Sequence, residues 1–302
     1  MAVSDITVHD DRMRSVLGPE SRLLSLFDGA RWSEGPVWRG ESEVLVWSDI
    51  ESRQLLCWHG SGEQLGMVTV WAAPTEFING NAVDERGRLV HCEHGRRCVS
   101  RTETDGTITV LIEHYEGNRF NSPNDLVVAD DGAIWFSDPT FGIDKAEQGY
   151  PAPPELDHRS VYRIDPSTNE VRRMVDLEQP NGLAFSPDGQ TLYVSDTSRE
   201  YDSGGLHDIF AFDVESGPEL SGRRRFAAIE PGLPDGLAVD SHGWVWTSSA
   251  SGVQVFDANS QILGVIETPH VCSNVAFGGS PFGSRVFITS AECLYAVDLR
   301  TP

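Results

Sequence analysis

Short segments in which apolar and polar residues alternate recur along the whole chain. Clear examples are SVYRID from Ser160 and DIFAFDV from Asp208. A period of two residues is typical of antiparallel strands with one face buried and the other facing water. Turns containing glycine separate these segments, and no stretch has sustained helical periodicity. The pattern predicts an all-β fold built from many short strands.

The alternating segments repeat as a unit. NDLVVADDGAIWFSD from Asn124, NGLAFSPDGQTLYVSD from Asn181 and DGLAVDSHGWVWTSS from Asp235 each contain a polar residue, an apolar strand, a turn with glycine and a second strand. The same frame fits three more segments, so six copies begin at Glu34, Asn79, Asn124, Asn181, Asp235 and Ser273. Their spacings are 45, 45, 57, 54 and 38 residues, with loops inserted near 141–158 and 199–207. This period predicts a six-bladed β-propeller with four antiparallel strands per blade.

The last copy reaches the C-terminus without a fourth strand, while SRLLSLF precedes the first copy. We therefore expect residues near 22–27 to complete the blade that contains 284–299. The chain then divides into an N-terminal extension, 1–20, and one propeller domain, 21–302. Aromatic residues of the second strands are expected to pack between blades. They are Trp47, Trp135, Tyr193, Trp246 and Phe287.

One column of the six-copy alignment is polar in every copy and directly precedes the predicted innermost strand. Its members are Glu34, Asn79, Asn124, Asn181, Asp235 and Ser273. Inner strands line the channel of a propeller, so these side chains should form a ring of oxygen donors at one mouth. Such donors, without His or Cys, favour a hard divalent cation. We expect Ca²⁺, with Mg²⁺, Mn²⁺ or Zn²⁺ as alternatives.

Asn and Asp also cap turns, which offers a second explanation of the polar column. For Asn79 and Ser273 both explanations stay open. Glu34 is a poor turn cap, which favours the metal explanation there.

Composition and charge limit the kinds of partner that the chain can bind. With 46 acidic and 23 basic residues the net charge is −23, which opposes binding to nucleic acid. The cluster Arg223, Arg224 and Arg225 is interpreted as a solvated strand face. Five cysteines without CxxC spacing predict free thiols and a reducing compartment. No segment suggests a membrane span, and the first twenty residues lack a signal-like apolar run, so we expect a cytoplasmic protein, with a removed signal as the alternative.

Several motifs together resemble one protein family. They are SEGPVW, NSPNDLVV, FSDPTFG, QPNGLAFSPDG and LPDGLAVD. The chain from about residue 20 onward resembles the family of gluconolactonases, regucalcin (senescence marker protein) and luciferin-regenerating enzyme. That resemblance implies a six-bladed propeller with one catalytic divalent metal that hydrolyses sugar or related lactones. It also implies Glu34, Asn181 and Asp235 as metal ligands, with Asn124 at or just beyond the metal.

The resemblance extends to further site residues. Arg119 and Asn121, in NRFNSPND, resemble a substrate-contacting pair next to Asn124. Asp138 and Asp196 resemble acidic positions near the active site, although carboxylates at strand ends also serve as turn caps. His94, in EHGRR, resembles a recurring segment of bacterial gluconolactonases, but nothing in the chemistry assigns it a role.

The expected reaction is hydrolysis of a small lactone such as glucono-1,5-lactone. Asp235 is the candidate general base, with Asp196 and Asp138 as alternatives. A lactonase for non-sugar lactones and a non-enzymatic propeller, either calcium-binding or a scaffold, are the competing functions. Paraoxonase-like and strictosidine-synthase-like propellers use similar strands, but SEGP, SPND and PNGL argue against them. The oligomeric state is left open.

Overall fold

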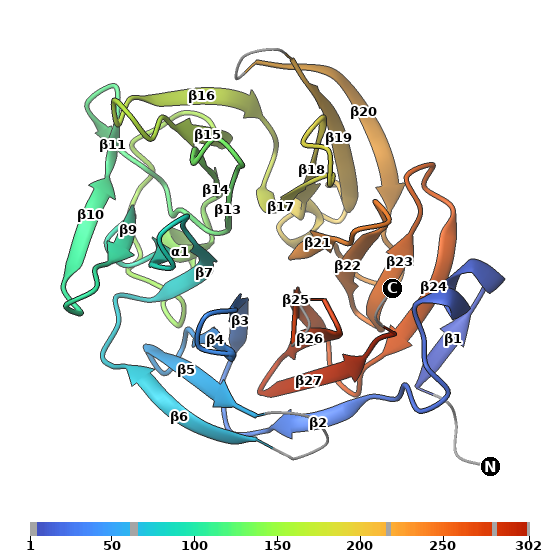
Figure 1. Ribbon diagram of the computed structural model, residues 1–302. Helices are drawn as coiled ribbons and strands as arrows, with labels where there is room; N and C mark the ends of the chain where they lie inside the picture. Colours follow the sequence, from blue (N-terminus) through green and yellow to red (C-terminus); the bar gives the residue numbers. More distant parts are fainter. Residues whose placement is uncertain (1–4, 61–65, 216–218, 280–282, 301–302) are drawn as a thin grey trace.

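The computed structural model describes residues 5–60, 66–215, 219–279 and 283–300. Six antiparallel sheets stand around a central channel like the blades of a propeller, as Figure 1 shows. Five sheets have four strands and one has five, while a separate two-stranded sheet, β11 (His114–Tyr115) with β12 (Asn118–Arg119), lies at the outer edge. The predicted six-bladed propeller is therefore confirmed.

Each blade is described from its inner to its outer strand. Blades 1 to 3 consist of β3 (Ser33–Arg39), β4 (Val44–Asp49), β5 (Gln54–His59) and β6 (Met67–Ala72); β7 (Ile78–Val83), β8 (Leu89–Glu93), β9 (Cys98–Thr102) and β10 (Ile108–Ile112); and β13 (Leu126–Val128), β14 (Ile134–Asp138), β15 (Ser160–Ile164) and β16 (Val171–Asp176). Blades 4 to 6 consist of β17 (Pro180–Phe185), β18 (Thr191–Asp196), β19 (Asp208–Val214) and β20 (Leu220–Ala228); β21 (Leu237–Val239), β22 (Val245–Ser249), β23 (Gly252–Phe256) and β24 (Ile262–Glu267); and β25 (Cys272–Gly278), β26 (Arg285–Ser290), β27 (Cys293–Asp298) and β2 (Leu24–Phe27).

The turn between the first and second strands depends on glycine. Gly132, Gly189 and Gly243, which superpose in the repeat, all have positive φ, between 68° and 81°. Each donates its N–H to the backbone oxygen of the residue three positions earlier, at 2.8 to 2.9 Å. Glycine adopts this backbone conformation without steric cost, so the glycine fixes the hairpin in these three copies.

The ring closes as predicted, because β2 pairs with β27. Leu24 faces Ala296 and Ser25 faces Tyr295 in an antiparallel register. The N-terminal strand therefore completes the blade formed by the end of the chain.

Residues before the propeller domain are also part of the fold. Strand β1 (Ile6–Val8) adds a fifth strand to blade 5 by pairing with β24, and the short 3₁₀ helix η1 (Asp11–Ser15) follows it. Met13 of this helix is fully buried in the apolar cluster around Trp246 and Val255. Arg12 fixes the segment by donating to Asp257 at 2.8 Å. By pairing with β24, the extension covers a strand edge whose backbone N–H and C=O groups would otherwise be exposed.

Aromatic side chains pack between neighbouring blades. Trp47 meets Phe27 of blade 6 edge-on at 5.7 Å, and Trp246 meets Phe277 at 5.4 Å. Trp135 contacts Phe185 of the next blade at 5.5 Å. These contacts confirm the structural role predicted for these three tryptophans.

Other sequence expectations concern the surface and the thiols. All five cysteines are free and buried. Within the described ranges, no helix is long and apolar enough to cross a membrane. The basic cluster lies on outer strand β20, where Arg224 and Arg225 pair with Asp213 and Asp208. The cluster is a solvated strand face, as expected.

Met13→Ala tests whether the N-terminal extension belongs to the core. We expect the free energy of unfolding to fall by about 2–5 kcal/mol, because a buried side chain is replaced by a cavity. Arg14→Ala, on the exposed side of the same helix, is the matched control and should change stability by less than about 0.5 kcal/mol. Urea unfolding followed by circular dichroism measures both, and equal stability of the two variants would contradict the integration of residues 6–15.

Candidate functional site

The six inner strands β3, β7, β13, β17, β21 and β25 contact one another in a closed ring around the channel. The polar column lies at one end of this ring. Glu34, Asn79, Asn181 and Ser273 are the second residues of their strands, whereas Asn124 and Asp235 stand just before theirs. The prediction that every column residue precedes its strand is therefore wrong for four of six blades. In those four blades the strand pairs one residue before the column and then shifts register at or directly after the column.

Glycines that follow the column bring neighbouring inner strands together. The N–H of Gly80, Gly182 and Gly236 donates to the backbone oxygen of the next blade's column residue, at 2.8, 3.1 and 2.7 Å. A Cβ on Gly80 or Gly182 would lie 2.6 or 2.5 Å from that oxygen. Only glycine permits so close an approach.

Two opposite blades carry a polar side chain where the others carry these glycines. Asn274 of blade 6 donates its Nδ2 to Asp125 Oδ2 of blade 3 at 3.3 Å. A Cβ on Gly236 would lie 1.9 Å from the Asn274 side chain, so the glycine makes room for this bridge across the channel. Beyond the bridge, the remaining length of the inner strands lines a cavity of about 850 Å³ with both apolar and polar side chains. The bridge separates the column residues from this cavity.

Three carboxyl groups occupy this end of the channel. Burial, followed by the charges of Asp235 and Asp125, raises the pKa of Glu34 well above its usual value. Burial raises the pKa of Asp125 to about 6. Loss of hydration, with the nearby charge of Glu200, raises the pKa of Asp235 to about 7, even though the residue keeps partial access to solvent.

No basic side chain neutralises these carboxyl groups: none of the ion pairs between described residues includes Glu34, Asp125 or Asp235. Their donor atoms are carboxylate oxygens, accompanied by the amides of Asn79, Asn124 and Asn181. A divalent cation would relieve the mutual repulsion, and an all-oxygen set suits Ca²⁺, Mg²⁺ or Mn²⁺. The residues present therefore fit the expected metal.

His94 is a site residue to which sequence reasoning gave no role. It is 1% exposed, and its Nε2 lies 3.2 Å from Asn79 Nδ2 and 3.3 Å from Asn124 Nδ2. Burial lowers the pKa of His94 to about 4. The segment EHGRR was the available signal, but the contact joins the end of β8 in blade 2 to the start of blade 3 and leaves no periodic trace.

Asp138 and Asp196, the alternative bases, hold backbone segments instead. Asp138 accepts from the N–H groups of Asn121 and Ser122, both at 2.8 Å. Asp196 accepts from Glu178 N at 2.8 Å and from Ser198 N at 3.0 Å. Both carboxylates are fully buried at the ends of second strands, and these contacts fit the turn-cap alternative.

Asp49 occupies the same position in blade 1 and accepts from Arg31 N and Trp32 N. The strand-end carboxylate is therefore a repeated clamp on the segment that enters the inner strand.

The two residues of the predicted substrate-contacting pair, Arg119 and Asn121, lie in different environments. Arg119 lies on outer strand β12, where its guanidinium donates to the backbone oxygen of Arg96. Asn121 is fully buried; its Nδ2 donates to His158 O at 3.0 Å, and its Oδ1 has no partner. Of the three predicted substrate-binding residues, only Asn124 lies in the column.

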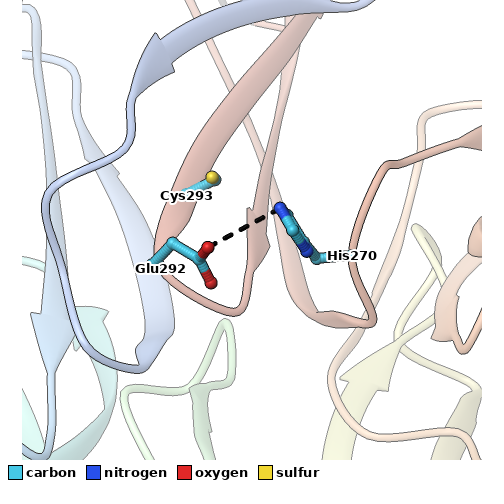
Figure 2. A group of neighbouring side chains, drawn as sticks. All are labelled: His270, Glu292 and Cys293. Atoms are coloured by element: carbon cyan, nitrogen blue, oxygen red, sulfur yellow. Dashed lines mark ion pairs between the residues drawn. The ribbon is translucent and has the colours of Figure 1, made fainter.

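A second group of metal-type side chains lies in blade 6, outside the column. His270 Nε2 stands 3.6 Å from Glu292 Oε1, and the ligand atoms of His270, Glu292 and Cys293 all lie within 4.8 Å of one another. Figure 2 shows the imidazole and the carboxylate facing each other, with the sulfur beside them. The side chains of His270 and Glu292 are 44% and 46% exposed, so we treat this contact as a solvated ion pair of little energetic weight.

Comparisons with known proteins agree with this fold and identify the family. Residues 32–292 match the family described as SMP-30/Gluconolactonase/LRE-like region. The solved structure of a gluconolactonase from Xanthomonas campestris is 49% identical, with a TM-score of 0.91 over 98% of this chain and 94% of that chain. A gluconolactonase from Zymomonas mobilis is 26% identical over 99% of this chain and 87% of its own length. The pentonolactonase XacC from Haloferax volcanii is 29% identical over 86% of this chain and 82% of its own length.

Asp138→Asn tests whether the strand-end carboxylate clamps the segment that enters the inner strand. The amide can accept from one backbone N–H but turns an N–H of its own toward the other, so we expect a loss of about 2–4 kcal/mol in unfolding free energy. Asp130→Asn, at an exposed position in the same blade, is the control and should be near neutral. Denaturant unfolding measures both variants. A fully stable Asp138→Asn protein that has lost turnover would instead return Asp138 to the list of bases.

Metal binding should depend on pH, because the raised carboxyl pKa values of the metal-free chain favour the protonated forms. A cation needs the ionised forms, so affinity for Ca²⁺ should fall roughly tenfold per pH unit below pH 7. With chelator present, the same shifts should make unfolding free energy fall as pH rises from 5 toward 8. Calorimetric titration in buffers of different ionisation enthalpy reports the proton that is released when Ca²⁺ binds. If the Ca²⁺ affinity did not change between pH 8 and pH 5.5, the assignment of these carboxyl groups to the metal site would be refuted.

Proposed function

The chain belongs to the SMP-30/gluconolactonase/LRE-like family, and we propose that it is a lactone hydrolase that opens a sugar lactone to the aldonic acid. Glucono-1,5-lactone is the first candidate substrate, because both the Xanthomonas and the Zymomonas relatives are gluconolactonases. The wide coverage of these matches supports a shared reaction class.

The observation that carries the proposal is the set of uncompensated carboxyl groups at the end of the channel. Glu34, Asn181 and Asp235 would hold a divalent cation, with Asn124 beside them, and Ca²⁺ is our first choice. When bound, such a cation supplies Lewis-acid polarisation of the lactone carbonyl.

Proton transfer falls to Asp235 in this proposal. Its carboxylate takes a proton from the attacking water, whose oxygen bonds to the carbonyl carbon. The bond between that carbon and the ring oxygen then breaks, and the ring oxygen receives the proton that Asp235 took from the water, which returns Asp235 to its ionised form. Asp235 is favoured over Asp138 and Asp196 because it keeps access to solvent, whereas both others are fully buried and bound by backbone N–H groups.

Two inserted segments form the rim on which substrate would rest. Lys145, just after helix α1 (Phe141–Asp144), pairs with Glu200 of the 3₁₀ helix η2 (Ser198–Glu200). Phe141 stacks on Tyr201 at 5.7 Å between the same two segments. Both Lys145 and Glu200 influence the pKa of Asp235, so this rim borders the proposed base. We leave Arg119 out of the substrate site because of its place on the outer sheet.

The cytoplasmic location stays part of the proposal, supported by five free thiols. A calcium-binding or scaffold propeller without activity, and a lactonase for non-sugar lactones, are the alternatives that the following experiment separates.

A pH-stat assay should detect metal-dependent hydrolysis of aldonolactones, abolished by chelator, and little hydrolysis of acyl-homoserine lactones. Asp235→Asn should lose turnover by about 100-fold or more even at saturating metal, because its base is gone. Asn181→Asp should keep or tighten metal binding, yet turn over about tenfold more slowly, because added negative charge weakens carbonyl polarisation.

Each outcome of the assay decides between the alternatives. Full recovery of Asp235→Asn at high metal would make Asp235 a ligand only. Metal binding without hydrolysis of any lactone would favour the non-enzymatic propeller.

A further inference from the structure

The imidazole of His94 connects two amides of the polar column to a distant loop. His94 follows β8 in blade 2, and its Nδ1 lies 3.0 Å from the backbone oxygen of Gln148 in blade 3. On the other side of the ring, Nε2 faces the side-chain amides of Asn79 and Asn124. All three side chains are at most 5% exposed.

The chemistry of these partners determines where the proton lies. A backbone oxygen only accepts, so His94 Nδ1 must carry the hydrogen. A second proton on Nε2 would bury an imidazolium, and no carboxylate is recorded in an ion pair with His94 in the described part of the chain. Nε2 is therefore an acceptor, and the atoms of Asn79 and Asn124 that face it must be the NH₂ groups.

This fixes both amide orientations. Each Oδ1 must point away from the imidazole, and neither accepts a hydrogen bond from another described residue. Neither oxygen is among the buried atoms that lack a partner, so both remain accessible at the column. They are free acceptors at the place where a cation and a polyhydroxylated ligand would bind.

We propose that His94 is a positioning residue, which holds the amides of Asn79 and Asn124 with both oxygens turned toward the channel mouth. This inference rests on the proposed function: the Asn124 oxygen then supports the metal, and the Asn79 oxygen accepts from a hydroxyl group of the sugar lactone. Asn79, for which turn capping was an open alternative, thereby becomes part of the site. His94 itself contacts neither metal nor substrate.

The insertion in blade 3 holds His94 in place. A Cβ on Gly142, in α1, would lie 2.5 Å from His94 Cβ and Cγ, so the helix packs directly against the imidazole. Tyr150 anchors the same segment to blade 2 through an edge contact with Phe77 at 5.2 Å and a hydrogen bond to Glu76 at 3.1 Å.

Two amide substitutions separate the roles of the two ring nitrogens. His94→Gln places an amide oxygen near the position of Nε2 and keeps the acceptor. His94→Asn keeps a donor near the position of Nδ1 but has no atom at Nε2. Calorimetric titration with Ca²⁺, without lactone, and the KM and kcat for gluconolactone are measured for both, after circular dichroism and thermal unfolding establish that each is folded.

We expect His94→Asn to weaken Ca²⁺ binding by about 10- to 100-fold and to raise KM, as the loss of a ligand-orienting contact does. His94→Gln should stay within about threefold of the parent. Equal losses in both variants, or parent-like Ca²⁺ binding by folded His94→Asn, would overturn the proposal.

A second readout does not depend on metal or activity. Two-bond ¹H–¹⁵N correlation spectra of the metal-free parent at pH 7, assigned by comparison with His94→Asn, should show protonated Nδ1 and unprotonated Nε2. The opposite tautomer, or an imidazolium, would overturn the inference. If the parent binds no divalent cation, the proposed metal site fails, and the tautomer together with KM still decides the role of His94.

Discussion

Close approach of the inner strands at one end of the channel is the constraint on which the rest of this structure depends. Gly80, Gly182 and Gly236 let one blade donate to the backbone of the next at 2.7 to 3.1 Å, and Ser273 Oγ ties blade 6 to Ser33 O of blade 1 at 2.6 Å. These bonds consume backbone polar groups that would otherwise be buried without partners. They also bring side chains from all six blades to one small region.

Convergence has an electrostatic consequence. Glu34, Asp125 and Asp235 sit where hydration is poor and no basic residue pairs with them, so their pKa values rise together. Such a group lowers the stability of the ionised fold unless a cation compensates it. The same arrangement that is unfavourable for the metal-free chain is favourable for binding a hard cation, which is a frequent relation between stability and function.

The sequence was most informative where the structure is periodic. The six copies, the strand that completes blade 6 and the polar column follow from local spacing, because each blade repeats the same hairpins. Aromatic packing between blades was predicted, but polar contacts between blades were not: His94 joins Asn79 to Asn124, and Asp125 reaches Asn274 across the channel, through pairs that share no spacing. The strand β1 was missed because three residues are too short for a periodic signal. Asp138 and Asp196 were recognised as special, but only the geometry showed that their oxygens serve backbone N–H groups.

A ring of six similar blades cannot by itself distinguish one end of an asymmetric lactone from the other. In this chain the symmetry is broken at a few defined places. Asp125 and Asn274 replace glycines in two opposite blades, and the insertion that carries α1 occurs in blade 3 only. That insertion places Gln148 O against His94, so an irregular loop determines the orientation of two amides of the repeated polar column. The repeat therefore supplies the oxygen donors, and the departures from the repeat decide which way they point.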